Sequence, residues 1–417
     1  MFTPRVRRLD RSASRWQTPR SNEKHDTGVH RAARTHHVAA KAAIVVAIAL
    51  AAGIAQPQLA AASKAPGGPK QVGFRVATSQ NPSATANALS GVSCHGTSFC
   101  VAVGFYVIAA VDKTLVEMLN GSRWTTSPST SPSVTSNYLV DVSCPLRSFC
   151  MAVGTQGAGS SARTLVERWN GHVWSTSTSL NPGSQDSLAA VSCATSHFCM
   201  AVGTQVQHRA SHTLVEMWNG ARWRIAPSTN VGRGANRLHG VSCTAARFCM
   251  AVGERVLGGH SVTLIEWWRG KRWVTLASRN PGVINLLNGV SCTTTSSCEA
   301  VGNQVRGAGT RTLIERWNGR RWSTMRSTSP NLHSALWAVS CPRTRSCKAV
   351  GDFQAGGMDR TLVESWNGLR WSTSVSANPS SRDGLNGVSC SSMTACKPVG
   401  YEIVNSSTYD SLVEWGA

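Results

Sequence analysis

The sequence predicts an all-β protein, a seven-bladed β-propeller built from four-stranded antiparallel blades. Three observations support this prediction: a repeat of 49 or 50 residues, four strand-like runs within each repeat, and incomplete repeats at the two ends that complement each other. A period of about 40 to 50 residues is typical of propeller blades and of paired-helix arrays. The local pattern within the repeat therefore decides the fold class.

The repeat is marked by two cysteines with five residues between them. Its first cysteine recurs seven times, at Cys94, Cys144, Cys193, Cys243, Cys292, Cys341 and Cys390. The second cysteine leads into A-V-G in most repeats, and a stretch of variable length then leads into T-L-[VI]-E-x-W. Length alone would favour two or three domains. The repeat instead makes residues 71–417 one domain.

Each repeat contains four short runs suited to strands, such as residues 238–243, residues 249–253, residues 312–317 and the segment that begins at Trp322. The runs are rich in Val, Thr and Trp and are bounded by Gly, Asn, Pro and Ser, as strands are. An Asn-Gly pair between the third and fourth runs favours a type I′ hairpin turn. No run keeps the 3.6-residue apolar period of a helix.

The two ends predict how the ring closes. The last repeat stops after its third strand, at residues 412–415, and residues 73–82 before the first repeat match residues 173–182. The first of these segments has Phe74 where the second has Trp174. Pairing it with the last repeat would complete the seventh blade and leave no long unpaired edge. The alternative, a linear solenoid, would leave both partial repeats unpaired.

The segment before the propeller is expected to direct export. Residues 1–62 read as a basic leader plus signal peptide, or as an uncleaved N-terminal anchor, and residues 63–70 as a linker. The apolar run at residues 42–55 is shorter than the roughly 20 residues of a spanning helix. Small residues follow it at 60–62, where a signal peptidase would cleave. We therefore expect a secreted or cell-surface protein.

The cysteines are expected to form one disulfide within each repeat, since an even count at fixed spacing in an exported chain is typical of disulfides. The expected pairs are Cys94–Cys100, Cys144–Cys150, Cys193–Cys199, Cys243–Cys249, Cys292–Cys298, Cys341–Cys347 and Cys390–Cys396. Seven zinc sites are the alternative. Each would need two further ligands, and no His recurs at a fixed repeat position. No metal or other cofactor is therefore expected.

The repeated Trp and Glu positions are interpreted first as structural. Twelve Trp recur on the third and fourth strands, where large aromatics can fill the space between blades, while a ring of sugar-stacking Trp is the functional alternative. The Glu of T-L-[VI]-E is expected to be buried, and a buried carboxylate needs hydrogen bonds or a cation. Its expected partners are backbone N–H groups or a nearby Arg, such as Arg222, Arg272, Arg321 or Arg370.

The charge balance favours anionic partners outside the cell. The net charge is +22; residues 1–63 contribute ten cations and three acids, or +7, which leaves +15 on the rest. Such a field attracts acidic partners without choosing among them. We expect a monomer that binds a glycan, an anionic cell-wall polymer or a protein. Nucleic acid is not expected as a partner, and a membrane only through the possible anchor.

Binding is expected on the face that carries the loops between the second and third strands and between blades, because these loops vary while the opposite turns repeat. The candidate ligand-binding residues are Trp337, His239, Arg209, Arg255, Arg306, Arg311 and Arg360. Trp337 is expected near the mouth of the central channel, either exposed for stacking or packed against a loop. No catalytic motif occurs. A propeller hydrolase or lyase with an active site at the channel mouth is the alternative function.

The motifs V-S-C-x5-C-x-A-V-G and T-L-V-E-x-W-N-G-x-x-W resemble those of the Trp- and Cys-containing repeat propellers in exported proteins of high-GC Gram-positive bacteria. The resemblance covers about residues 71–417. The predicted architecture is similar to that of kelch and RCC1-type propellers. The similarity is one of architecture only, because their signature motifs are absent. The resemblance implies a propeller fold and export, and it implies no activity.

Overall fold

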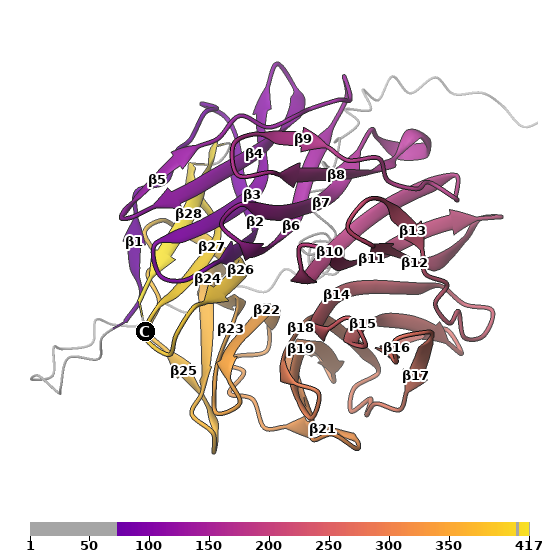
Figure 1. The fold of residues 1–417 in the computed structure, drawn as a ribbon. Coiled ribbons are helices and arrows are strands. Elements are labelled where there is room, and N and C mark those ends of the chain that lie inside the picture. Colours follow the sequence, from indigo (N-terminus) through magenta and orange to yellow (C-terminus); the bar gives the residue numbers. More distant parts are fainter. Residues whose placement is uncertain (1–72, 406–407, 417) are drawn as a thin grey trace, which may run out of the picture. The chain divides into compact units, whose positions relative to one another are not determined.

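A computed structural model describes residues 73–405 and 408–416. These residues form seven four-stranded antiparallel sheets arranged as blades in a ring, which confirms the predicted seven-bladed propeller (Figure 1). The expected leader, signal peptide or anchor, and linker lie outside the described residues. Within the described part, no helix is long and apolar enough to cross a membrane.

Each blade follows the same order from the centre of the ring outward. The innermost strands are β2 (Asn87–Cys94), β6 (Asn137–Leu146), β10 (Gln185–Thr195), β14 (Asn236–Ala245), β18 (Ile284–Thr294), β22 (Ser334–Arg343) and β26 (Arg382–Cys390). The second strands are β3 (Phe99–Ile108), β7 (Phe149–Gln156), β11 (Phe198–Gln207), β15 (Phe248–Leu257), β19 (Ser297–Arg306), β23 (Ser346–Ala355) and β27 (Cys396–Asn405).

In each blade the outermost strand is shorter than the third strand. The third strands are β4 (Val111–Asn120), β8 (Arg163–Trp169), β12 (Ala210–Trp218), β16 (His260–Trp268), β20 (Gly309–Trp317), β24 (Met358–Trp366) and β28 (Thr408–Trp415). The outermost strands are β5 (Arg123–Thr126), β9 (Trp174–Thr176), β13 (Trp223–Ile225), β17 (Trp273–Leu276), β21 (Trp322–Met325), β25 (Trp371–Ser374) and β1 (Arg75–Ala77). We number the blades 1 to 7 by their innermost strands, from β2 to β26.

The ring closes where the sequence predicts. Strand β1 pairs with β28 and becomes the outermost strand of blade 7, so the indigo start and the yellow end of the described chain lie side by side (Figure 1). The pairing sets Val76 opposite Glu414. Phe74 is buried in the cluster between blades 6 and 7, as the match with Trp174 implies.

Apolar side chains of neighbouring blades form the core. One cluster, for example, joins Val202 and Val215 of blade 3 to Leu238 and Leu264 of blade 4. Ten of the twelve repeated Trp side chains are buried, whereas Trp169 is half-buried and Trp415 is exposed. The packing interpretation therefore holds at most of these positions.

A β-bulge in every innermost strand explains the glycine of A-V-G. In blade 3, for example, the β10–β11 register shifts between Leu188 and Ala190, opposite Gly203. A Cβ atom at Gly203 would lie 2.0 Å from the carbonyl oxygen of Ser187, and the corresponding glycines of the other blades have the same contact. Since no side chain fits there, the repeat requires glycine.

An inner ring of hydrogen bonds ties each blade to the next. The serine hydroxyl of V-S-C accepts the backbone N–H of the following blade's first cysteine, at 2.9–3.1 Å in all seven places. The bond from Cys94 N–H to Ser389 Oγ completes this ring between blades 1 and 7. The serine of the motif is thus an interblade contact.

The glutamates of T-L-[VI]-E form a second set of interblade contacts. All seven are fully buried: Glu117, Glu167, Glu216, Glu266, Glu315, Glu364 and Glu414. Each accepts hydrogen bonds from the segment that leaves the outermost strand of the preceding blade. Ser278 Oγ, for example, donates to both carboxylate oxygens of Glu315 at 2.7 and 2.8 Å. We call this contact the Glu clasp.

The partners of the Glu clasp correct one expectation in part. Serine hydroxyls and backbone N–H groups hold the carboxylates, as in the bond from Thr229 N–H to Glu266. The expected arginines do not pair with them. The side chains of Arg222 and its equivalents are exposed in the outer turns, and the two ion pairs among the described residues are Arg237–Glu254 and Arg316–Glu299.

All seven expected disulfides are present and no cysteine is free. Each bond joins the innermost and second strands of one blade across the loop between them. In five of the blades the two cysteines are directly opposed partners in the ladder, as Cys193 and Cys199 are. Disulfides of this kind are typical of an oxidising compartment.

We predict that the free energy of unfolding decreases as the pH rises from 5 to 8. Burial raises the pKa of Glu315 from its ordinary value of 4.5 to about 7. The same cause raises the pKa of Glu216 to about 7 and that of Glu266 to about 8. Between pH 4.5 and these raised pKa values, the folded state binds more protons than the unfolded state. The contribution of these glutamates to the free energy of unfolding is therefore fully present below pH 4.5 and is lost as the pH rises through 7.

Thermal unfolding of the oxidised protein across this pH range measures the effect. Glu315→Gln removes one titrating group while it keeps an oxygen that accepts the Ser278 hydrogen bond. This variant should therefore show a smaller loss of Tm between pH 5 and pH 8. A Tm that rises with pH in the unmodified protein would contradict the prediction.

We also predict that removing one disulfide weakens the fold without abolishing it. The double variant Cys193→Ala and Cys199→Ala should lower the free energy of unfolding by about 2 kcal/mol, the loop-entropy contribution of so short a ring. Urea unfolding measures the change. A variant as stable as the unmodified protein would contradict this prediction.

Candidate functional site

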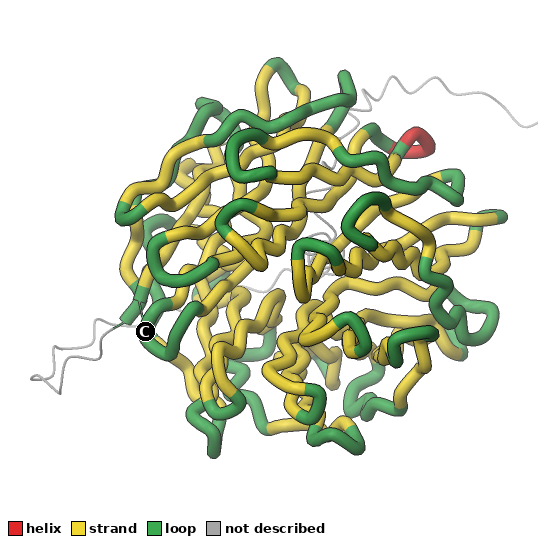
Figure 2. The backbone as a smooth tube through the Cα atoms, viewed as in Figure 1, coloured by secondary structure: helices red, strands yellow, loops and turns green. Residues whose placement is uncertain are grey.

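The two faces of the ring carry different kinds of connection. Figure 2 shows in green the loops and turns that join the strands. The variable face carries the turns between second and third strands and the segments between blades. The disulfide face carries the cysteine loops and the turns between third and outermost strands. The five expected binding arginines lie on the variable face, in loops or near strand ends. The centre of the ring joins the two faces.

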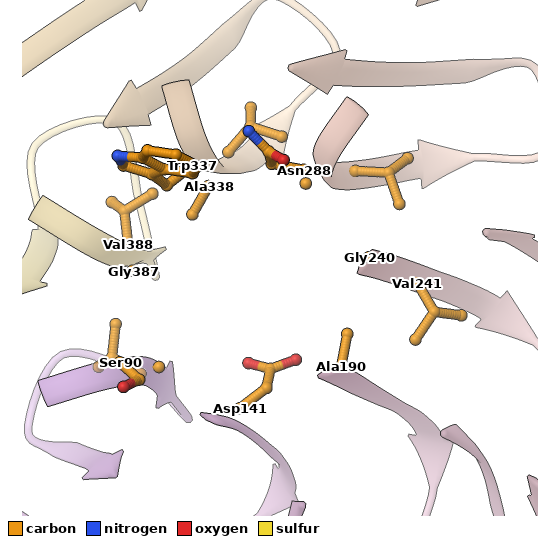
Figure 3. A pocket seen from close by; sticks show the side chains of 15 residues that line it. Ser90, Asp141, Ala190, Gly240, Val241, Asn288, Trp337, Ala338, Gly387 and Val388 are labelled. Atoms are coloured by element: carbon orange, nitrogen blue, oxygen red, sulfur yellow. The ribbon is translucent and has the colours of Figure 1, made fainter. Parts of the chain in front are cut away.

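The centre of the ring holds a small cavity of about 100 Å³. The innermost strands line it mostly with small residues, among them Gly240 and Ala338, and also with Trp337 (Figure 3). Pockets for drug-sized ligands are usually 300–1,000 Å³. The central cavity is smaller than this range.

Asp141 is the one ionisable side chain among the residues that line this cavity. Its carboxylate extends into the space between the strands (Figure 3), and one of its oxygens accepts the backbone N–H of Val191 at 2.9 Å. Acid–base catalysis by propeller enzymes needs at least a second group within reach of the substrate. No cluster of three or more His, Cys, Asp or Glu suited to a metal occurs in the described part of the chain.

Trp337 and His239 lie in innermost strands at the bulged position, and their side chains are only 4% and 5% exposed. The indole Nε1 of Trp337 donates a hydrogen bond to the carboxylate of Asp352. Burial raises the pKa of Asp352 to about 6, and this hydrogen bond opposes the rise. Trp337 borders the central cavity, and its ring is buried rather than exposed. Neither ring is presented for stacking on a ligand.

Four of the five expected arginines lie on three adjacent blades. Arg209 is in the β11–β12 turn of blade 3, Arg255 is in β15 of blade 4, and Arg306 and Arg311 flank the β19–β20 turn of blade 5. All but Arg255, which is half-buried, are exposed. Arg360 of blade 6 lies apart from them and donates to the Ser380 carbonyl at 3.1 Å.

The acids of blades 3 to 5 do not offset this positive charge at the surface. Their carboxylates are all buried, at Asp186, Glu216, Glu254, Glu266, Glu299 and Glu315. The half-buried carboxylates of the described residues lie elsewhere, at Asp141, Asp352, Asp359, Glu402 and Asp410. We call the variable-face arginines Arg209, Arg233, Arg255, Arg306, Arg311 and Arg326 the basic sector.

Blade 7 has the opposite character at the same level. Asp383, Glu402 and Asp410 are cross-strand partners on β26, β27 and β28. Burial raises the pKa of Glu402, and the two neighbouring carboxylates raise it further. The variable face therefore has a basic side on blades 3 to 5, whereas on blade 7 the half-buried carboxylates of Glu402 and Asp410 lie near the exposed Arg382.

The geometry defines a β-propeller with a closed ring and disulfide-braced blades. No protein-family profile matches the chain, and no curated protein matches it. Among solved structures, the chain is similar to "YCF48 bound to D1 peptide", with 12% identity, a TM-score of 0.52, and coverage of 82% of this chain and 97% of that one.

Two further structures show the same likeness. YCF48 from Cyanidioschyzon merolae has 12% identity and a TM-score of 0.50, with coverage of 82% and 98% of the two chains. A GH74 xyloglucanase from Xanthomonas campestris has 10% identity and a TM-score of 0.49, and the match spans 82% of this chain and 55% of the enzyme. At these identities the likeness to YCF48 supports the propeller fold and nothing finer.

We predict that Trp337→Ala destabilises the protein by about 3–5 kcal/mol, as expected for removal of a buried Trp side chain. Urea unfolding measures this loss. Arg306→Ala changes an exposed side chain of the neighbouring blade and is the control. It should unfold at the same urea concentration as the unmodified protein. A Trp337→Ala variant of unchanged stability would show that the indole ring is not packed in the ring of blades.

Proposed function

We propose that this protein is an exported, non-enzymatic binding protein that recognises an acidic segment of a partner protein through its variable face. One observation carries the proposal: the basic sector extends over three adjacent blades that expose no carboxylate. A surface of one sign attracts the opposite sign and speeds association with it.

The irregularity of the variable face favours a protein over a regular polymer as the partner. Near the turn that joins the second and third strands, the cross-strand partners differ from blade to blade. Gln304 lies opposite Arg311 in blade 5, for example, and Glu402 lies opposite Asp410 in blade 7. A polymer of identical units would meet a different surface on each blade. A protein can present acidic and basic side chains in a matching order.

The lining of the central cavity supports binding over catalysis. Within the described residues this cavity measures about 100 Å³, and Asp141 is the one ionisable side chain among the residues that line it, whereas acid–base catalysis needs a second group within reach of the substrate. YCF48, which has the same fold, is described as bound to a peptide. That binding belongs to YCF48, and it supports the proposal only by showing that such a propeller can accept a peptide.

The disulfides support a secreted or cell-surface location. Seven of them brace seven blades, and such bonds persist outside the reducing cytosol. The basic leader with its apolar run at residues 42–55 favours the same location. A monomer is sufficient for the proposed role, because the ring is closed within one chain.

The test is a binding screen of the oxidised protein against acidic peptides, neutral glycans and cell-wall polymers. We expect saturable binding to acidic peptides that weakens with salt. Arg306→Glu with Arg311→Glu should reduce the affinity by at least about tenfold, since each reversal removes one attraction and adds one repulsion.

Blade 5 also supplies the matched control. Arg320→Glu with Arg321→Glu makes the same charge change on the disulfide face, in the turn between β20 and β21. The control should keep the peptide affinity within about twofold. Equal losses in the two double variants would contradict a site on the variable face. Binding of neutral glycans alone, or turnover of a glycan, would contradict the proposed function.

A further inference from the structure

Among the described residues, the disulfide face also carries exposed cations. It consists of the seven cysteine loops and the six turns between third and outermost strands. Twelve exposed cations lie on these loops and turns: Arg123, Arg147, Arg222, Arg247, Arg269, Lys271, Arg272, Arg320, Arg321, Arg343, Arg345 and Arg370. None of the loops and turns contains Asp or Glu.

The side chains of these cations make few contacts within the protein. None forms an ion pair, since both ion pairs of the described residues lie elsewhere. In the outer turns the asparagine side chain bonds to backbone N–H groups, as Asn318 Oδ1 accepts from Arg321 N–H at 3.0 Å, and the guanidinium is left to solvent. Two exceptions have local contacts: Arg147 donates to Ser98 Oγ, and Arg269 lies over the Trp267 ring.

Nine of the twelve cations concentrate on blades 4 to 6, and we call these nine the crescent: Arg247, Arg269, Lys271, Arg272, Arg320, Arg321, Arg343, Arg345 and Arg370. The loops and outer turns of a blade touch there. A Cβ at Gly270 would lie 3.1 Å from Arg247 Cγ, and one at Gly368 would lie 2.9 Å from Arg345 Cβ. Inner and outer cations of one blade are therefore neighbours.

Like charges placed together weaken the folded state through repulsion. The crescent therefore needs an explanation other than stability. Soluble proteins usually intersperse both signs on such a surface. An anionic partner that occupies the crescent would remove the repulsion and gain the attraction.

We propose that the crescent binds a linear phosphodiester polymer of the cell exterior. Arginine recognises phosphate through paired N–H donors and remains charged at every physiological pH. The crescent also repeats, because Arg272, Arg321 and Arg370 occupy the same turn position in three successive blades. A repeated cation suits a partner whose charges repeat along a chain.

A lipid membrane fits the crescent less well. Stable binding to a membrane surface usually combines cations with apolar anchors. Leu369 is the one large apolar side chain exposed among the loops and turns of the crescent. A polymer chain needs no such anchor. The crescent is also on the opposite face from the basic sector, so this proposal is independent of the proposed function.

The experiment measures binding of poly(glycerol phosphate) to the oxidised protein as salt is varied. The test variant changes Arg320, Arg321, Arg343 and Arg345 to Gln. The matched control changes four exposed arginines of the variable face to Gln, at Arg233, Arg306, Arg311 and Arg326. The crescent variant should bind at least about 30-fold more weakly. Its slope of log affinity against log salt should fall by about 3, because four phosphate contacts are lost at about 0.7 each.

Urea unfolding shows whether a loss of polymer binding is due to a loss of folded protein. The crescent variant should be as stable as the unmodified protein or more so, because it loses repulsion. Equal loss of polymer binding in the crescent variant and in its control, or no binding by the unmodified protein, would overturn the proposal. Crescent-dependent binding to vesicles of phosphatidylglycerol and phosphatidylcholine with none to the polymer would assign the face to a membrane instead.

Discussion

The propeller depends on a contact between blades: a buried carboxylate on the third strand of one blade that holds the segment leaving the preceding blade. A single β-sheet of four strands cannot bury both of its faces, so each blade is stable only against its neighbours. The Glu clasp fixes that neighbour contact on one side of the ring, and the bond from the cysteine N–H to the V-S-C serine fixes it near the centre. Because β1 completes blade 7, Glu117 meets Ser79 in the same way and the ring has no free end in these contacts.

The fold was predictable because its determinants repeat along the chain. The cysteine spacing set the blade length, and the match between residues 73–82 and 173–182 gave the closure. The partner of the Glu clasp was harder to predict, because Ser278 lies 37 residues before Glu315 and meets it only when two blades pack. Arg321 is much nearer in sequence, but the Asn-Gly turn directs it to solvent. Trp337 shows the same limit: a bulge buries its ring, and strand alternation alone does not reveal a bulge.

The division of the molecule into constant and varied parts has consequences for binding. The contacts that hold the ring use Ser, Glu, Gly and Cys at fixed positions of the repeat. The arginines of the basic sector and the crescent do not take part in these contacts. The sequence pointed to the variable face, because its loops differ from blade to blade. It did not point to the disulfide face, where the cations occur within repeated motifs and are easily read as part of the scaffold. The absence of any Asp or Glu from those loops and turns was the available signal.

We propose that two separate groups of surface arginines, on opposite faces of the ring, bind different partners. Arginine footprinting with phenylglyoxal, read by mass spectrometry, distinguishes the two groups. With poly(glycerol phosphate) present, we expect Arg321, Arg343 and Arg345 to become protected while Arg306 and Arg311 keep their reactivity; an acidic peptide should produce the reverse pattern. Uniform protection of both groups by either ligand, or protection of neither, would show that the two faces do not bind separate partners.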